Sequence, residues 1–282
     1  MRLSRTKAIT RRPLAILDIG SSKICCMIGE ADGAGGVRLL GHGTHASDGI
    51  RSGEVSDLDA LSSVIGKTVQ AAEREAGISV SAVTVVAPGG TPFSKICKKS
   101  VRLSDAVVRR RDMDRLMGGN DIGSIPENYQ PMHVQTLQYS LDDVRGIADP
   151  RGMRGTDLSV DYTLVCGMRT SLANLREALA LNHLESDRFL HSAYASGLAC
   201  LTAEERDLGS VIVDMGGGTT SIAIFMEGKL VYVDTIKIGG HRVTMDIARV
   251  LSTPVADAER LKAIDGSVMP TEITGIAPDP LR

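Results

Sequence analysis

The sequence predicts an α/β protein with two related lobes, because one local pattern occurs twice along the chain. Residues 14–20 (LAILDIG) read as an apolar strand that ends in Asp-x-Gly, followed by a short polar turn and a second apolar strand. Residues 211–216 (VIVDMG) repeat this pattern, with a glycine-rich turn and the returning segment SIAIFMEG. A further strand and a helix follow each copy, so each copy is expected to begin one lobe.

The elements after the first copy are a strand and an amphipathic helix. The strand is VRLLGHGTHA, and the helix is expected to start near Ser56. Its apolar residues at positions 58, 61, 65 and 72 fall on one face, and Gly77 is a typical stop.

The elements after the second copy have the same order. A Glu-Gly-Lys turn at 227–229 leads to the strand LVYVDTIKI, and two glycines precede a helix that carries Val243, Ile247 and Val250. The first turns of the two copies are expected to differ in length by one residue.

Both turns carry residue types suited to binding phosphate. Glycine and serine let consecutive backbone N–H groups converge on an anion, because no large side chain stands in the way. Lysine and threonine side chains can add charge-assisted hydrogen bonds to phosphate oxygens. The candidate phosphate-binding residues are Gly20, Ser21, Ser22, Lys23, Gly216, Gly217, Gly218, Thr219 and Thr220.

Asp18 and Asp214 are the candidate metal ligands, since each stands at the end of a buried strand. Mg²⁺ keeps most of its waters and needs only one or two carboxylates from a protein. Either turn by itself also fits an ordinary hairpin or a flexible loop. The two turns together, with matching flanks, favour nucleotide binding.

Composition excludes several other classes of function. The 32 Lys and Arg residues against 34 Asp and Glu residues give a net charge of −2, so no global positive field would attract nucleic acid. The five cysteines lack C-x-x-C spacing, which favours a reduced, cytoplasmic protein. The six histidines lack the spacing of a metal site apart from His42 and His45, which have no third ligand nearby in the sequence. No apolar stretch approaches the length of about 20 residues that a membrane span needs, so membrane contact is expected to be peripheral.

The motifs resemble those of a known superfamily. LDIGSSK is similar to the phosphate-1 motif and VDMGGGTTSIAIF to the phosphate-2 motif of the actin, heat-shock-chaperone and sugar-kinase superfamily. Between them, HSAYASGLACLTAEERDLGS is similar to the helix that connects the two lobes and the acidic turn after it. The resemblance implies an actin-like (ribonuclease H-like) fold with ATP and Mg²⁺ bound between the turns of Asp18 and Asp214.

The segment 83–167 carries a more specific resemblance, to the FtsA family. GIADPRGMRGTDL matches that family's G-I-x-D-P-x-G-x-x-G-x-x-L pattern between two strands, which implies the inserted subdomain called 1C. TPVADAERLK is similar to the family helix whose Glu and Lys approach the adenosine, which implies nucleotide contacts for Glu259 and Lys262. The alternative for this pair is an i,i+3 ion pair at the surface.

The resemblance divides the chain into consecutive parts, which are a basic flexible tail at 1–12, the first part of subdomain 1A at 13–82, subdomain 1C at 83–166, the return of 1A with the interlobe helix at 167–204, subdomain 2A at 205–240 and a partial subdomain 2B at 241–282. FtsA proteins continue with more of 2B, a glycine-rich adenosine loop and a C-terminal amphipathic membrane helix. None of these is visible after Ile264, so the second lobe is expected to be incomplete.

As an FtsA relative, the protein is expected to be a scaffold of cell division. The resemblance implies that it links FtsZ filaments to the inner face of the cytoplasmic membrane at the septum and that it self-associates into actin-like filaments. Membrane contact would normally come from the C-terminal helix. ATP would act chiefly as a conformational ligand, with at most slow hydrolysis and no residue identified as a catalytic base.

Three alternatives stay open at this point. A small-molecule kinase of the same superfamily would need a sugar pocket and an acidic base near the γ-phosphate, and the sequence offers no such constellation. A pilus-assembly adaptor of the PilM type shares the 1C subdomain. A truncated, nonfunctional fragment would not melt cooperatively.

Overall fold

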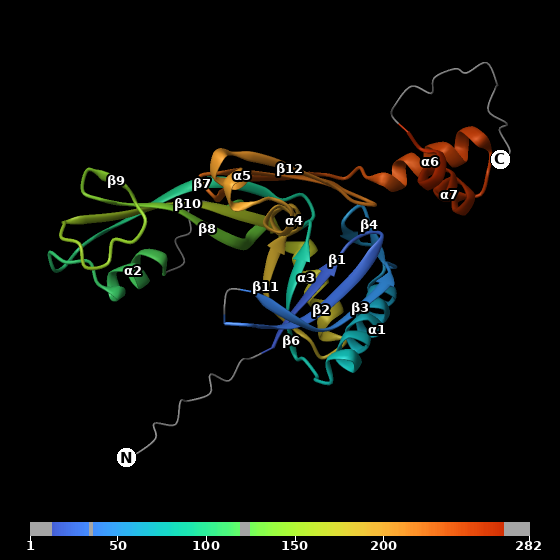
Figure 1. Ribbon diagram of the computed structural model, residues 1–282, viewed down its shortest axis with the longest axis horizontal. Coiled ribbons are helices and arrows are strands. Elements are labelled where there is room, and N and C mark those ends of the chain that lie inside the picture. Colours follow the sequence, from blue (N-terminus) through green and yellow to red (C-terminus); the bar gives the residue numbers. More distant parts are fainter. Residues whose placement is uncertain (1–12, 34–35, 119–124, 268–282) are drawn as a thin grey trace, which may run out of the picture. The chain divides into compact units, whose positions relative to one another are not determined.

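The computed structural model describes residues 13–33, 36–118 and 125–267 (Figure 1). The expected basic tail at 1–12 and the end of the expected subdomain 2B, from residue 268 onward, lie outside the described residues. The chain forms two compact units, residues 1–239 and residues 240–282, which are taken separately below.

A five-stranded sheet in the order β11-β6-β1-β2-β3 begins the first unit. The strands are β1 (Leu14–Ile19), β2 (Lys23–Ala31), β3 (Val37–Ala46), β6 (Ala82–Ala87) and β11 (Glu185–His191). Strand β2 runs antiparallel to both β1 and β3, whereas β6 and β11 run parallel to β1. The carboxyl ends of β1, β6 and β11 therefore open at the same edge of the sheet.

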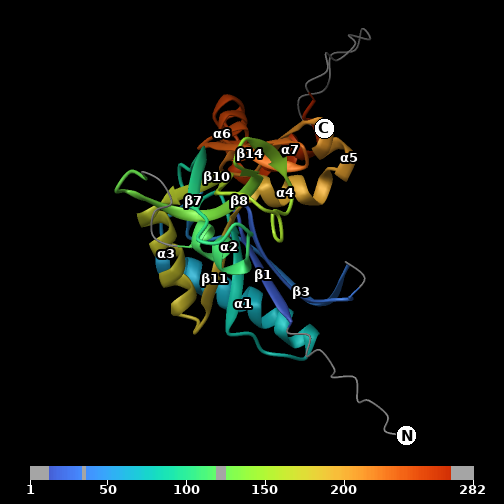
Figure 2. The same ribbon diagram turned by 90° about the vertical axis from the view of Figure 1, so that its left-hand side faces the viewer.

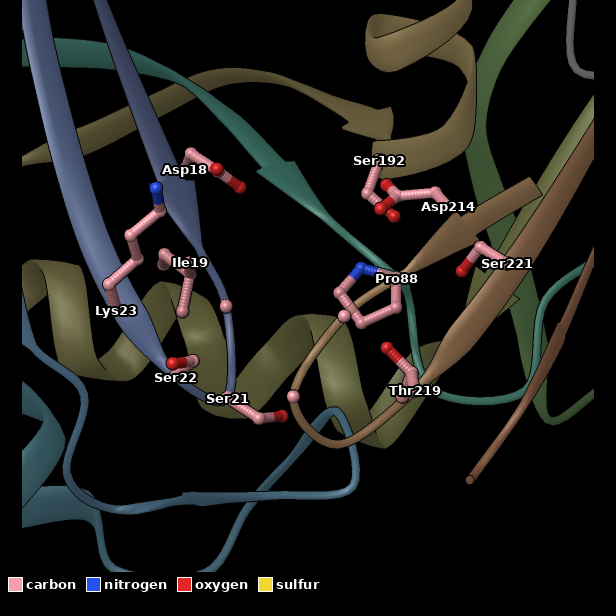
Figure 3. A pocket seen from close by; sticks show the side chains of 13 residues that line it. Asp18, Ile19, Ser21, Ser22, Lys23, Pro88, Ser192, Asp214, Thr219 and Ser221 are labelled. Carbon is pink, nitrogen blue, oxygen red and sulfur yellow. The ribbon is translucent and has the colours of Figure 1, made fainter. Parts of the chain in front are cut away.

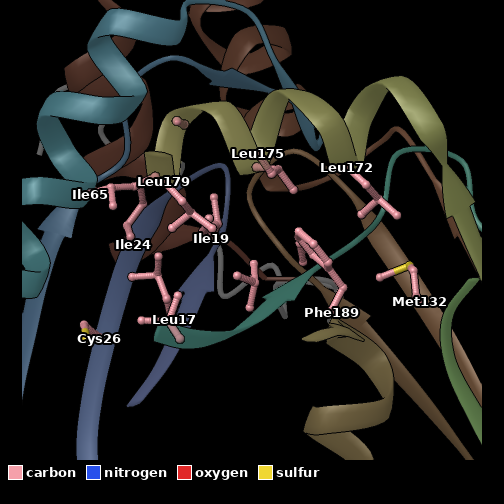
Figure 4. Close-up of a cluster of buried hydrophobic side chains, with 14 of the residues drawn as sticks. Leu17, Ile19, Ile24, Cys26, Ile65, Met132, Leu172, Leu175, Leu179 and Phe189 are labelled. Atoms are coloured by element: carbon pink, nitrogen blue, oxygen red, sulfur yellow. The ribbon is translucent and has the colours of Figure 1, made fainter. Parts of the chain in front are cut away.

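Helices α1 (Leu58–Ala76) and α3 (Arg169–Ala180) pack their apolar side chains against this sheet. Figure 4 shows Ile65 of α1 and Leu175 of α3 among the buried residues of β1 and β2. The Asp57 side chain caps α1 by accepting a hydrogen bond from the Ala60 N–H at 3.0 Å. The helix ends at Gly77, which adopts the left-handed conformation (φ 69°), as the sequence predicts.

A four-stranded antiparallel sheet follows in the segment predicted to be subdomain 1C. Its order is β7-β10-β8-β9, with β7 (Phe93–Arg102), β8 (Tyr129–Leu141), β9 (Val144–Ile147) and β10 (Asp157–Met168). The short helix α2 (Arg110–Met117) contributes Leu116 to the core of this sheet, which is separate from the core of the first sheet.

The third sheet of the first unit has the order β12-β13-β14 and carries the second copy of the repeat. Its strands are β12 (Ser210–Met215), β13 (Thr220–Met226) and β14 (Lys229–Ile236). Helix α4 (Ser192–Cys200) lies against it in both views (Figures 1 and 2). The contact is close at one point, because a β-carbon on Gly197 would stand 2.3 Å from the ring of Phe225.

The connection from α4 to β12 differs from the prediction. The residues expected to form an acidic turn after α4 form a short helix instead, α5 (Ala203–Leu208). Thr202 and Glu205 form a capping box, in which the Thr202 hydroxyl accepts from the Glu205 N–H at 3.2 Å and the Glu205 carboxylate accepts from the Thr202 N–H at 2.7 Å. This T-x-x-E signature starts a helix where the family resemblance implied an acidic turn.

A small hairpin of β4 (Ile50–Arg51) and β5 (Glu54–Val55) completes the first unit. The second unit contains α6 (Gly240–Leu251) and α7 (Val255–Asp265), which pack on each other. No helix in the described ranges is both long and apolar enough to cross a membrane.

Candidate functional site

The two predicted phosphate-binding turns have the same backbone geometry. The Gly20 N–H donates to the Lys23 carbonyl at 3.1 Å, and the Gly216 N–H donates to the Thr219 carbonyl at 2.9 Å. The strand pairs that close the two turns are equally spaced, Ile19 with Ile24 and Met215 with Thr220. By strand bounds the turns differ by one residue, as expected, because β2 begins at Lys23, which pairs with Ala46 of β3, whereas β13 begins at Thr220. Lys23 nevertheless occupies the position in the first hairpin that Thr219 occupies in the second.

The two turns touch each other directly. A β-carbon on Gly218 would stand 2.5 Å from the Ser21 hydroxyl oxygen and 3.0 Å from the backbone nitrogen of Ser52. Ser52 and Gly53 form the tip of the β4–β5 hairpin, with φ angles of 48° and 76°, and positive φ at both central residues defines a type I′ turn. The Gly53 N–H donates to the Ser21 hydroxyl at 3.2 Å, so this tip supports the first turn where it meets the second.

A cavity of about 180 Å³ lies between the turns (Figure 3). Strand β1 and its turn form one wall, and β12, β13 and their turn form the opposite wall. Both predicted metal ligands and most of the predicted phosphate-binding residues line this one space. The predicted residues in the lining are Asp18, Gly20, Ser21, Ser22, Lys23, Asp214, Gly216, Gly217 and Thr219.

The cavity is also lined by four residues that the sequence analysis did not single out, namely Ile19, Pro88, Ser192 and Ser221. Pro88 follows β6 and Ser192 follows β11, and both strands are parallel to β1. Residues that follow parallel strands gather at one edge of a sheet. The sequence shows each strand end but not the strand order, which is why these residues were missed.

Two carboxylates face the cavity from opposite walls. Burial is the main cause that raises the pKa of Asp18, the negative charge of Asp214 adds to it, and the nearby Lys23 partly offsets it. The Ser196 hydroxyl of α4 donates to the Asp214 carboxylate at 3.0 Å and holds it in place. A cation between the two carboxylates would relieve both the desolvation and the repulsion, so this pair fits a hydrated Mg²⁺ ion. Within the described ranges, no group of three or more His, Cys, Asp or Glu side chains is placed to hold a metal ion.

Two of the predicted phosphate-binding residues do not line the cavity. Gly218 lies at the contact between the turns, where its lack of a side chain allows the close approach to Ser21. The Thr220 hydroxyl donates to the Ile238 carbonyl at 2.8 Å, so it holds the segment that follows β14.

Glu259 and Lys262 belong to the second unit, on α7. The Lys262 ammonium group lies 2.7 Å from the Glu259 carboxylate and also donates to the Thr244 hydroxyl of α6 at 2.8 Å. The Thr244 hydroxyl in turn donates to Glu259. Hydrogen bonds from Lys262 and Thr244 lower the pKa of Glu259. Glu259 and Lys262 thus form the i,i+3 ion pair that the sequence left open as the alternative, and together with Thr244 they join α7 to α6. Their contact with adenosine stays a prediction.

The chain matches known proteins in two segments and over most of its length. Residues 89–166 match the family model "SHS2 domain inserted in FTSA", and residues 211–277 match "Cell division protein FtsA". Curated proteins named cell division protein FtsA are 41% identical over 266 residues in Agrobacterium fabrum and 28% identical over 263 residues in Escherichia coli K12. These alignments cover 91% and 93% of this chain, but 60% and 63% of the relatives.

Two solved structures share the fold at low sequence identity. A chain of the PilM-PilN type IV pilus biogenesis complex is similar with a TM-score of 0.61 and 18% identity, over 91% of this chain and 70% of that chain. The ethanolamine utilization protein EutJ from Carboxydothermus hydrogenoformans is similar with a TM-score of 0.52 and 14% identity, over 92% of this chain and 63% of that chain. Likeness at this level shows the fold alone.

The three sheets and the paired turns define an actin-like α/β protein with an inserted SHS2 domain, which confirms the predicted fold class. Within that class, the chain belongs to the FtsA family of cell division proteins. It spans about 60% of the length of the curated relatives that it matches. The curated relatives reported above carry one name, so the pilus-adaptor and small-molecule-kinase alternatives are not favoured.

Proposed function

We propose that the protein binds ATP with Mg²⁺ in the cavity between its two turns and serves as an actin-like scaffold of cell division. The observation that carries the proposal is the opposed pair of Asp18 and Asp214, with a Gly-Ser-Ser-Lys turn beside the first and a Gly-Gly-Gly-Thr turn beside the second. A Mg²⁺ ion would neutralise phosphate charge at this position, and the turns would supply polar groups around it.

Each part of the cavity has a distinct task in this proposal. Asp18 and Asp214 hold the waters of the metal ion, and Lys23 places a positive charge on the first wall. Gly217 leaves room for the phosphates to approach the backbone of the second turn. Because the two walls come from different sheets, a ligand that contacts both stabilises the arrangement in which they face each other. ATP then acts as a conformational ligand, and hydrolysis is at most slow.

The division role rests on membership of the FtsA family. On this proposal the protein links FtsZ filaments to the inner face of the cytoplasmic membrane at the septum, where its membrane contact is peripheral. It also self-associates into actin-like filaments, which ATP favours by ordering the cavity. A pull-down that compares an FtsZ C-terminal peptide with a pilus-assembly peptide tests the partner, and binding of the pilus peptide alone would overturn this assignment.

Calorimetric titration with Mg-ATP tests the site itself. Asp214→Asn removes a metal ligand and Gly217→Val fills the approach to the second turn, so each is expected to weaken binding by about 10- to 100-fold. Asp187→Asn is the matched control, because this exposed carboxylate lies on β11 and outside the cavity lining. Equal ATP affinity in the wild type, Asp214→Asn and Gly217→Val would refute the assignment.

A further inference from the structure

A chain of buried polar side chains runs from the cavity wall into the interior of the first unit. Ser221 of β13 lines the cavity (Figure 3), and its hydroxyl oxygen lies 2.7 Å from the Thr235 hydroxyl oxygen on β14. The Thr235 oxygen lies 3.1 Å from Nε2 of His191, the last residue of β11. Their exposed fractions are 1%, 4% and 0%, so water does not compete for these hydrogen bonds.

His191 is neutral at physiological pH. Burial is the main cause that lowers its pKa to about 3, His133 adds to the effect, and the carboxylate of Asp234 opposes it. A neutral imidazole carries one proton, on either Nδ1 or Nε2, so its two nitrogens act as one donor and one acceptor.

The surroundings of the ring decide which nitrogen carries the proton. Nδ1 is buried and has no hydrogen-bond partner among the described residues. A buried N–H without a partner is rarer in proteins than a buried acceptor without one. The proton therefore belongs on Nε2, which donates to the Thr235 hydroxyl oxygen.

That choice sets the direction of the rest of the chain. Thr235 makes side-chain hydrogen bonds to His191 and Ser221 within the described part of the protein. Because Thr235 accepts from His191, its own proton is given to the Ser221 oxygen. The Ser221 proton is then left for a ligand in the cavity. With the proton on Nδ1 the chain would reverse, and Ser221 could offer only its lone pairs.

We infer that His191 and Thr235 are positioning residues that present the Ser221 hydroxyl as a hydrogen-bond donor to a phosphoryl oxygen in the cavity. This inference rests on the proposed nucleotide function, and it specifies that Ser221 is the donor in its hydrogen bond with the phosphate. A hydroxyl that donates suits an anionic phosphoryl oxygen, whereas one that can only accept suits a metal-bound water. Ser221 therefore belongs to the phosphate side of the site.

The proton position can be measured without any nucleotide. Long-range ¹H–¹⁵N correlation spectra of the ¹⁵N-histidine-labelled protein, with His191 assigned by its loss in His191→Gln, report the tautomer directly. The expected result is a neutral ring protonated at Nε2 between about pH 5 and pH 8. A ring protonated at Nδ1, or one that becomes charged in this range, would overturn the inference.

Titration of variants with Mg-ATP and with adenosine tests the effect on the ligand. Ser221→Ala and Thr235→Val are each expected to weaken Mg-ATP binding about 10-fold and to leave adenosine binding unchanged. The double variant should lose no more than either single variant, because both break the same contact. Thr235→Ser keeps a hydroxyl at this position and should bind like the wild type.

The outcomes separate this inference from the proposed function. If Asp214→Asn weakens Mg-ATP binding while Thr235→Val does not, the site stands and the positioning role of Thr235 and His191 fails. If the wild-type protein binds no Mg-ATP, the proposed function fails and the role of Ser221 toward phosphate fails with it. Thermal melting of each variant confirms that the fold is kept, and the spectra give the tautomer in either case.

Discussion

Gly218 approaches Ser21 so closely that a β-carbon at position 218 would stand 2.5 Å from the Ser21 hydroxyl oxygen. The two residues are almost 200 positions apart in sequence, and each sits in one of the two repeated turns. Their contact is what places the two turns on opposite sides of one cavity. Glycine at 218 is therefore required by packing between the turns, in addition to any contact with phosphate.

Gly218→Ala is expected to destabilise the protein by about 1–3 kcal/mol, because the added methyl group overlaps the Ser21 side chain and crowds the Ser52 nitrogen. Denaturant unfolding measures the loss. Ser21→Gly in the same chain removes the overlapping hydroxymethyl group and should recover part of the stability. Equal losses in Gly218→Ala with and without Ser21→Gly would show that the two turns do not touch in solution.

Asp18→Asn is expected to stabilise the ligand-free protein at neutral pH and to weaken Mg-ATP binding by about 10- to 100-fold. The pKa of Asp18 is raised in the folded state, so its stabilising contribution is complete below the ordinary carboxyl pKa and is lost as pH rises through the folded value. Asparagine removes that loss. Thermal melts without Mg²⁺ should show the gain at neutral pH and none in acid. A lower melting temperature at neutral pH would contradict the electrostatic assignment.

Mg-ATP affinity of the wild type is expected to fall as the pH drops through the raised pKa of Asp18. The reason is that a protonated carboxyl no longer attracts the waters of a cation. Titrations across the acid range, corrected for protonation of ATP itself, measure the effect. Asp18→Asn should bind weakly at every pH and show no such decline, and a decline of equal size in the variant would place the titrating group elsewhere.

Lys262→Met tests the adenosine contact that remains a prediction for the second unit. The ion pair with Glu259 is partly exposed, so its removal should change the free energy of unfolding by less than about 1 kcal/mol. If Lys262 contacts the adenosine, the variant should lose affinity for ATP and keep its affinity for tripolyphosphate, as measured by calorimetry. Lys23→Met is the comparison and should weaken both ligands. Unchanged ATP binding in Lys262→Met would leave this lysine with only its structural role between α6 and α7.

Gly43→Ala probes how α1 lies on the first sheet. A β-carbon at this position of β3 would stand 2.1 Å from the Thr68 carbonyl oxygen, which is backbone and cannot rotate away. A destabilisation of about 1–3 kcal/mol or more is expected from this overlap. The neighbouring Thr44→Ala is the control, since Thr44 is exposed and its replacement should change stability by less than about 0.5 kcal/mol.

Much of the local structure follows from the sequence. Alternating burial along β1, with Ala15, Leu17 and Ile19 inside, is the period of a half-buried strand. Helix α1 carries its start and stop signals in Asp57 and Gly77. Helix α5 was missed because its only signal is a four-residue capping box, which is weak beside a run of charges.

The sequence by itself determined the two strand-turn-strand motifs, the carboxylate that ends each first strand, and the turn residues suited to phosphate. These are local properties, because they depend on burial period and on the side chains next to one another. Only the tertiary structure decided that Gly218 meets Ser21, that Pro88 and Ser192 share the cavity, and that His191 reaches Ser221 through Thr235. Those contacts depend on strand order and on how the sheets pack, which bring together side chains that no short sequence window contains.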